Sequence, residues 1–190
     1  MVSARNEERE FMERAFELAE EALASNEVPV GCVFTYEGRE VACGRNEVNR
    51  TKDPTTHAEM VALRNLQAEN PDIGEVILYN HFFRYHGEHK AVKEILRDLV
   101  LYVTLEPCIM CASGLYELGI SKIVYAAANE RFGGICSVGN WSKYNKEKAE
   151  VEVVVDSTYA DRSIALLKSF YDKQNPFAPE EKRKSKKSKQ

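Results

Sequence analysis

The sequence lacks any apolar run that approaches the roughly 18 residues of a membrane-spanning helix, and it has no cationic start followed by a short apolar segment. Internal repeats are also absent. Its five cysteines are an odd number, and two of them form a C-x-x-C pair, which a metal ion explains better than a disulfide does. We therefore expect a soluble, intracellular protein from a reducing compartment that does not engage a membrane.

Positive charge is concentrated at the C-terminal end of a chain whose net charge is −4. Residues 180–190 contain six Lys or Arg and two Glu, so this tail contributes +4 and the remaining body carries −8. An acidic body is a poor surface for phosphate backbones, whereas the tail is suited to them. The same run is also compatible with a solvated, disordered end or a nuclear localisation signal. Its basic residues include Lys182, Arg183, Lys184, Lys186 and Lys187.

The length of 190 residues fits one domain of roughly 150 residues with extensions. We expect that domain at 1–178, with a helical insertion at about 70–99 and a disordered basic tail at 179–190. Apolar spacing predicts helices at 6–24, 56–69, 107–118 and 158–174, and strands at 30–36, 39–44, 100–104, 122–127 and 151–155. A hairpin followed by alternating strands and helices indicates an α/β fold, a three-layer α/β/α sandwich around a five-stranded mixed sheet.

Three candidate metal ligands fall at the predicted starts of two helices. His57 lies at the first turn of one helix, and Pro107, favoured at a first helical position, opens the helix that carries Cys108 and Cys111. Two cysteines three residues apart on a helix point the same way, and the positive N-terminus favours their thiolates. One imidazole and two thiolates would leave a zinc ion one open position, where a bound water has a pKa of about 7. A redox pair or two buried cysteines would leave the histidine unexplained.

Glu59 lies two residues after His57 and has two interpretations. Thr56 to Glu59 has the spacing of a capping box, in which the glutamate only caps its helix. Beside a zinc-activated water, the same carboxylate would be a general base and then a general acid in hydrolytic deamination. The combination H-x-E with P-C-x-x-C is typical of zinc nucleobase deaminases, and this favours the catalytic role.

Six further segments resemble one deaminase family. They are 26–32 (NEVPVGC), 44–49 (GRNEVN), 57–62 (HAEMVA), 101–104 (LYVT), 106–112 (EPCIMCA) and 129–134 (NERFGG). Together they resemble the catalytic subunit of the eukaryotic tRNA adenosine deaminases, over about residues 10–178. The resemblance implies a cytidine deaminase-like fold and conversion of adenosine to inosine at the wobble position of tRNA anticodons.

The resemblance also implies roles for particular residues and partners. His57, Cys108 and Cys111 match the zinc ligands, and Glu59 matches the catalytic glutamate that the family's related, non-catalytic subunit lacks. Asn46 matches a residue that hydrogen-bonds the extruded base, with Val30 beside Pro29 forming an apolar wall. The basic tail matches one that holds tRNA. We therefore expect Zn²⁺ as cofactor, a heterodimer, and a location in the cytoplasm and nucleus.

Two alternatives stay open, a deaminase of a free base or nucleotide of the guanine or deoxycytidylate type, and a non-catalytic zinc subunit. The chain also departs from the family pattern in two places. Residues 70–99 match no family motif, and Ile135-Cys136-Ser137 stands where Cys-Gly-Ser is expected after the paired glycines.

Overall fold

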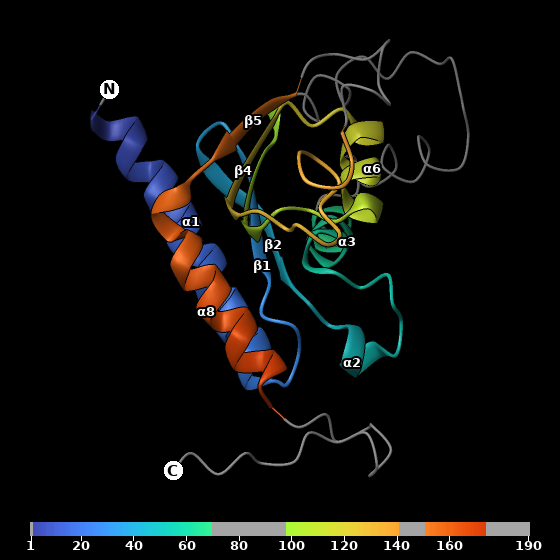
Figure 1. Cartoon of the computed structure of the whole chain (residues 1–190). Helices are drawn as coiled ribbons and strands as arrows, with labels where there is room; N and C mark the ends of the chain where they lie inside the picture. The colour runs from blue at the N-terminus through green and yellow to red at the C-terminus, as the bar shows by residue number, and fades with distance from the viewer. Residues whose placement is uncertain (1, 70–97, 141–150, 174–190) are drawn as a thin grey trace, which may run out of the picture.

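The computed structural model describes residues 2–69, 98–140 and 151–173 (Figure 1). Most of the predicted insertion and the entire basic tail therefore lie outside the described residues. Within the described ranges no helix is both long and apolar enough to cross a membrane.

The centre of the fold is a five-stranded mixed sheet in the order β2-β1-β3-β4-β5. Its strands are β1 (Gly31–Tyr36), β2 (Arg39–Arg45), β3 (Val100–Leu105), β4 (Lys122–Ala127) and β5 (Glu152–Val155). β1 pairs antiparallel with both β2 and β3, whereas β3 with β4 and β4 with β5 are parallel. Glu37 and Gly38 connect β1 to β2 with positive φ angles, so the tight hairpin forms where the sequence predicted it.

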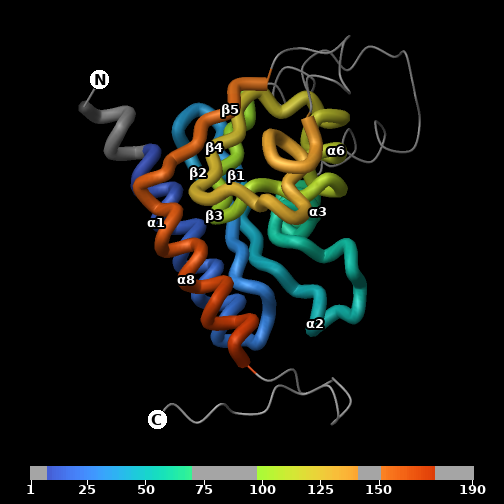
Figure 2. The backbone as a smooth tube through the Cα atoms, viewed as in Figure 1, coloured from blue at the N-terminus to red at the C-terminus, as the bar shows by residue number. Residues whose placement is uncertain are grey.

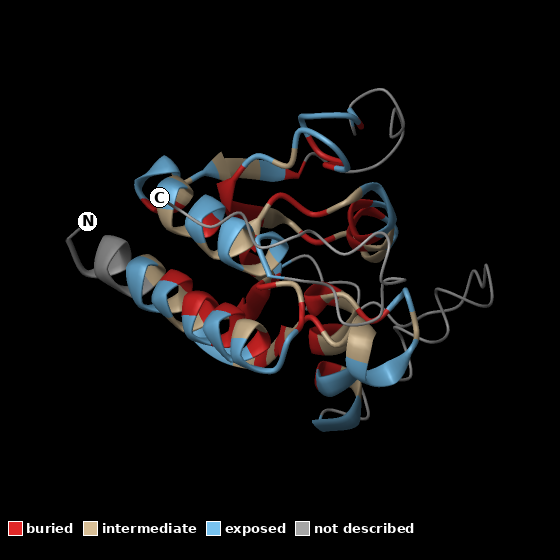
Figure 3. Cartoon of the chain, turned by 60° about the horizontal axis from the view of Figure 1, so that its bottom comes forward, coloured by how far each residue is buried: buried red, intermediate tan, exposed pale blue. Residues whose placement is uncertain are grey.

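Helices cover both faces of this sheet. α1 (Val2–Ala24) and α8 (Ala160–Tyr171) lie side by side on one face, and α3 (Ala58–Glu69) and α6 (Ile109–Leu118) lie on the other (Figures 1 and 2). A 3₁₀ turn, η1 (Ser157–Tyr159), precedes α8, and a short α2 (Val48–Thr51) follows β2. The buried residues, red in Figure 3, lie where the helices and strands of neighbouring layers face one another.

Alternation along the strands explains why both faces are apolar. In β3, Leu101 and Val103 join the core beneath α3 and α6, while Tyr102 joins the core beneath α1 and α8. In β4, Ile123 faces the first core and Val124 the second. Strands buried on both faces are expected to be apolar throughout, because side chains of period two point to both layers.

One glycine lets α3 approach the sheet closely. A Cβ atom on Gly44 of β2 would lie 2.5 Å from the Ala58 carbonyl oxygen and 2.6 Å from the Ala62 nitrogen. Only glycine permits that separation, and α3 carries His57 at its entrance. Gly44 therefore sets the distance between the sheet and the histidine side of the candidate site.

The predicted three-layer α/β/α fold with five strands is confirmed, and the strand and helix order matches. Three local predictions were wrong. α6 begins at Ile109 with Cys108 as its N-cap, so Pro107 is not the first helical residue. His57 lies just before α3 rather than within its first turn. The short α2 falls between the strand predicted at 39–44 and the helix predicted at 56–69, where no helix was expected.

Candidate metal centre

His57 lies immediately before the first residue of α3, on the face of the sheet that α3 covers. The His57 backbone N–H donates to the Thr55 carbonyl, and the His57 carbonyl accepts from the Val61 N–H. The Thr56 hydroxyl donates to the Asp53 carbonyl and is 2.7 Å from the Thr51 hydroxyl. Those contacts use Thr56 to close the preceding turn, rather than in the capping-box pairing that its spacing with Glu59 allowed.

The entrance to α6 presents the two thiols. Cys108 is the N-cap residue with an extended backbone, and Cys111 is buried in the first helical turn. The Ala112 N–H donates to the Cys108 carbonyl, which is the first intrahelical bond. Both sulfur atoms therefore lie at the positive end of the helix dipole, which favours thiolate.

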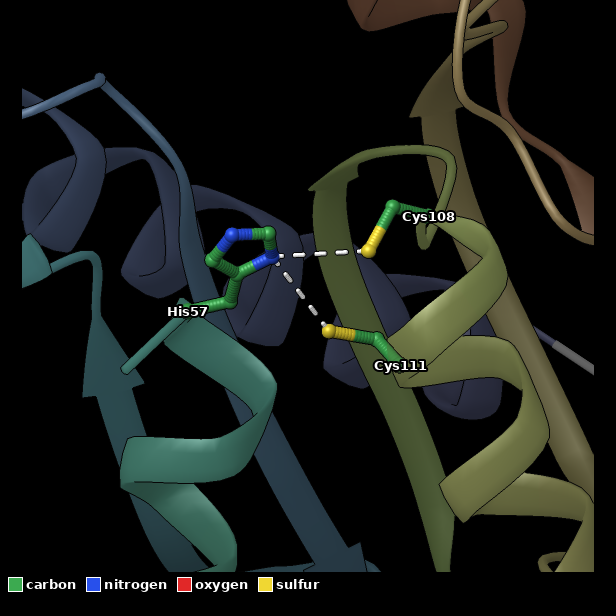
Figure 4. A group of neighbouring side chains, drawn as sticks. All are labelled: His57, Cys108 and Cys111. Carbon is green, nitrogen blue, oxygen red and sulfur yellow. Dashed lines mark hydrogen bonds between the residues drawn. The ribbon is translucent and has the colours of Figure 1, made fainter. Parts of the chain in front are cut away.

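The three candidate ligands converge on one point (Figure 4). His57 Nδ1 lies 3.4 Å from Cys108 Sγ and 3.6 Å from Cys111 Sγ, and the three donor atoms are all within 4.8 Å of one another. With Zn–N of about 2.05 Å and Zn–S of about 2.3 Å, a tetrahedral ion separates a nitrogen and a sulfur ligand by about 3.6 Å. The donor set and its spacing therefore fit a zinc ion held by three side chains.

The protonation of this cluster also suits a cation. Hydrogen bonds from Cys111 and then His57 lower the pKa of Cys108 to about 4, although burial opposes this. The pKa of Cys111 is raised, first by its hydrogen bond to Cys108 and then by burial. The hydrogen bond to Cys108 raises the pKa of His57 against the effect of burial. Two thiols and an imidazole that share protons in this way are poised to exchange them for a metal.

Glu59 belongs to α3, lies beside the three candidate metal ligands and is only 3% exposed. Burial raises the pKa of its carboxyl group, and a hydrogen bond from Cys111 and the nearby His57 partly oppose the rise. A carboxyl group with a raised pKa binds a proton more readily than an exposed one, which suits a group that takes up and returns a proton. The structure thus brings the predicted acid–base group next to the predicted ligands.

A groove of about 1490 Å³ opens at this cluster. One wall contains His57, Glu59 and Cys108, and the far wall is the face of α8 with Ile164 and Phe170. Asn46 and Val30, both predicted to contact a base, line the groove as well. Pro29 is buried beside Val30. The predicted tail residues Lys182, Arg183, Lys184, Lys186 and Lys187 lie outside the described residues.

Two buried carboxylates flank the cluster, and sequence reasoning missed both. Glu27 accepts hydrogen bonds from Asn46 Nδ2 at 3.2 Å and from the N–H groups of Asn49 and Arg50 at 2.9 and 2.7 Å. Glu106, two residues before Cys108, accepts bonds from the loop that follows β4. A single glutamate has no spacing pattern, so the only sequence signal was their place inside family motifs.

Comparison with known proteins agrees with this geometry. Residues 5–127 match the model of the cytidine and deoxycytidylate deaminase zinc-binding region. The tRNA-specific adenosine deaminase 2 of Xenopus tropicalis is 42% identical over 173 residues, which are 90% of this chain and 93% of the relative.

Two solved structures are similar. One comes from studies of A-to-I editing by tRNA:A34 deaminases at the wobble position; it has a TM-score of 0.65 and 27% identity, and the match covers 84% of this chain and 99% of that chain. The guanine deaminase of Nitrosomonas europaea has a TM-score of 0.60 at 21% identity, with 84% and 82% covered, and shares the fold. By sequence, zinc-ligand geometry and fold, the chain belongs to the zinc-dependent cytidine deaminase-like family and, within it, to the tRNA-specific adenosine deaminases.

Proposed function

We propose that this chain is the catalytic subunit of a tRNA adenosine deaminase that converts adenosine to inosine at the wobble position of anticodons by hydrolysis. The observation that carries the proposal is the meeting of Glu59 with His57, Cys108 and Cys111 at the end of an open groove. The 42% identity to a tRNA-specific adenosine deaminase supports the choice of substrate.

The chain's own residues divide the chemistry between them. When bound, zinc would supply a nucleophilic water with a pKa of about 7. Glu59 takes one proton from the attacking water and delivers it to the ring nitrogen. It then takes the remaining proton from the hydroxyl group now attached to the ring carbon and delivers it to the amino group, which leaves as ammonia. Water and adenosine thus become inosine and ammonia. His57, Cys108 and Cys111 hold the ion and leave one position open for the nucleophile.

The groove suits a base that belongs to a polymer. Its volume of about 1490 Å³ exceeds the roughly 300–1,000 Å³ of ordinary small-molecule pockets, and it continues past the metal ligands along α8. Asn46 and Val30 would contact the extruded base at one end. An anticodon loop already exposes its bases, so extruding one costs less than it would in a duplex.

A partner subunit and the tail complete the proposal. The body without residues 180–190 is acidic, so phosphate contacts fall to the basic tail and to the surface of a related, non-catalytic subunit. Ile109, Met110, Phe132 and Val138 are exposed apolar side chains near the start of α6, where such a subunit would bury them. We place this heterodimer in the cytoplasm and nucleus, where tRNA is made and used.

The test is inosine formation at the wobble position of intact tRNA by the chain with and without a candidate partner. Free adenosine, cytidine, guanine and deoxycytidylate serve as competing substrates. Turnover of a free substrate with none on tRNA would instead establish the free-base or nucleotide alternative. Unchanged tRNA deamination by a complex carrying Glu59→Ala would make this chain the non-catalytic subunit.

A further inference from the structure

The carboxylate of Glu106 collects hydrogen bonds from one loop. Its Oε1 accepts from the N–H groups of Ile135, Cys136 and Ser137 at 3.1, 2.7 and 3.0 Å. Its Oε2 accepts from the Asn129 N–H at 2.9 Å and from the Ser137 hydroxyl. Glu106 is 1% exposed, and in every one of these contacts it is the hydrogen-bond acceptor. The carboxylate is therefore the anchor around which this loop folds.

The same loop is joined directly to the segment that carries the metal ligands. The Gly134 N–H donates to the Pro107 carbonyl at 2.8 Å, and the Ile109 N–H donates to the Phe132 carbonyl at 3.0 Å. A Cβ atom on Gly133 would lie 2.3 Å from the Glu106 carboxylate, so only glycine lets the loop wrap so closely. Cys108 therefore lies between two residues, Pro107 and Ile109, that are hydrogen-bonded to the loop held by Glu106.

This arrangement also explains the departure at Ile135-Cys136. Both residues bind Glu106 through backbone N–H groups, which do not depend on the side chain. Ile135 places its side chain in the core beneath α6, and the Cys136 side chain is exposed. The loop keeps its anchor although neither residue matches the expected pattern.

Glu27 has the matching position on the other side of the metal centre. Its Oε2 accepts from Asn46 Nδ2 and the Asn49 N–H, and its Oε1 accepts from the Arg50 N–H. An ionised carboxylate only accepts hydrogen bonds, so it admits the Asn46 amide with its nitrogen toward Glu27 and not its oxygen. Glu27 is 1% exposed, and the amide it orients is 5% exposed and lines the groove.

We propose that Glu27 and Glu106 are paired positioning residues that divide the site between them. Glu106 acts through the backbone of the loop on Cys108 and hence on the metal. Glu27 acts through the Asn46 amide on the bound base. The second assignment rests on the proposed function, because it takes Asn46 as a base contact; the first depends only on the zinc ligands.

The test uses the same substitution at both positions. Glu106→Gln turns one acceptor oxygen into an N–H donor that faces N–H donors, and Glu27→Gln lets the Asn46 amide reverse. Glu17→Gln, on the exposed surface of α1, is the matched control. General loss of stability would change both buried variants alike, whereas the positioning roles predict that each variant changes a different property.

The first measurement is zinc release to a chelator, together with the visible absorption of the cobalt-substituted protein. We expect Glu106→Gln to accelerate release roughly tenfold and to shift the cobalt bands, because residues that orient metal ligands have effects of this order. Glu27→Gln and Glu17→Gln should match the wild type. If Glu106→Gln does not fold, Ser137→Ala removes one of the five hydrogen bonds and should give a smaller acceleration of about twofold.

The second measurement is the KM of the assembled complex for tRNA. We expect Glu27→Gln to raise KM roughly tenfold with a smaller change in kcat, and to have less than a twofold effect in an Asn46→Ala background. If Glu27→Gln does not fold, Glu27→Asp is used instead, because it keeps the charge but withdraws it from Asn46. It should raise KM by less than tenfold, and in an Asn46→Ala background it should have no further effect on KM.

Wild-type zinc release in Glu106→Gln or, if that does not fold, in Ser137→Ala would overturn the assignment of Glu106. Additive effects of the Glu27 substitution and Asn46→Ala on KM would overturn that of Glu27. A wild-type complex that forms no inosine would contradict the proposed function instead, and the zinc-release result for Glu106 would still stand.

Discussion

The layer formed by α1 and α8 and the region around the metal centre bury different kinds of side chain. Beneath α1 and α8 the buried cluster is almost entirely apolar, and includes Phe16, Tyr102 and Val124. Around the metal centre, Glu27, Glu59 and Glu106 are buried as well. Burying a carboxylate costs free energy unless hydrogen bonds or charges compensate for it. Donated hydrogen bonds compensate for the burial of Glu27 and Glu106, so the cost in stability falls mainly on Glu59. The first region therefore contributes mainly to stability, and the second maintains groups for chemistry.

The strongest test of this contrast is to neutralise the acid–base group. Glu59→Gln keeps the size of the side chain but cannot shuttle a proton, so we expect kcat to fall about 10²- to 10⁴-fold. Zinc content should stay at the wild-type level, because Glu59 is not a ligand in the arrangement described. Inosine formation on tRNA and metal analysis of the same preparation measure the two quantities. A variant with normal kcat would remove Glu59 from the mechanism.

A large change on the opposite side of the sheet should have the reverse signature. Phe16 is fully buried between α1 and the sheet, and its ring stacks on Tyr159 with centroids 5.5 Å apart. Phe16→Ala should lower the free energy of unfolding by about 3–5 kcal/mol through lost burial and the resulting cavity. Denaturant unfolding measures this change. In the fraction that remains folded, zinc stoichiometry should equal that of the wild type, and a loss of zinc there would break the contrast.

Deleting residues 180–190 should weaken substrate binding without affecting the metal centre or the layer formed by α1 and α8. The deletion removes six cationic side chains and two anionic ones. We expect weaker tRNA binding and a shallower dependence of the logarithm of affinity on the logarithm of salt concentration. Zinc content should not change. Equal salt slopes for the full-length and truncated complexes would show that the tail does not contact phosphate.

The smallest effect is expected from an ion-pair network on the helical layer. Arg162 of α8 donates to Glu13 at 2.6 Å and to Glu20 at 2.8 Å, and its guanidinium lies 4.4 Å from the centroid of the Phe16 ring. These groups are partly exposed, so solvent screens them. Arg162→Ala should cost about 1 kcal/mol of stability and leave kcat unchanged. Thermal unfolding and inosine formation together check this expectation.

Sequence patterns were sufficient for the layers and for the ligands. In the part of the chain that the structure describes, the apolar period identified α1, α3, α6, α8 and the five strands, because each of these elements buries side chains at regular intervals. The metal donors were found because ligand chemistry restricts them to a few residue types at short spacing. Both kinds of signal are local, and a single sequence displays them directly.

The parts that the sequence did not reveal depend on contacts between distant segments. Glu27 accepts hydrogen bonds from the backbone of α2, and Glu106 accepts them from the loop after β4. Neither glutamate belongs to a repeating sequence pattern. α2 is only four residues long, and its N-terminal N–H groups at Asn49 and Arg50 find their acceptor in Glu27. Pro107 suggested an earlier start for α6 because proline is favoured at the first helical position, whereas here it lies just before the N-cap residue Cys108.

Zinc K-edge X-ray absorption of the purified protein tests the central claim most directly. We predict two sulfur atoms at about 2.3 Å and two nitrogen or oxygen atoms at about 2.0–2.1 Å, one from His57 and one from solvent. In Cys108→Ala the number of sulfur ligands should fall from two to one. Protein that binds no zinc, or a spectrum with a third sulfur or a fourth side-chain ligand, would contradict the account.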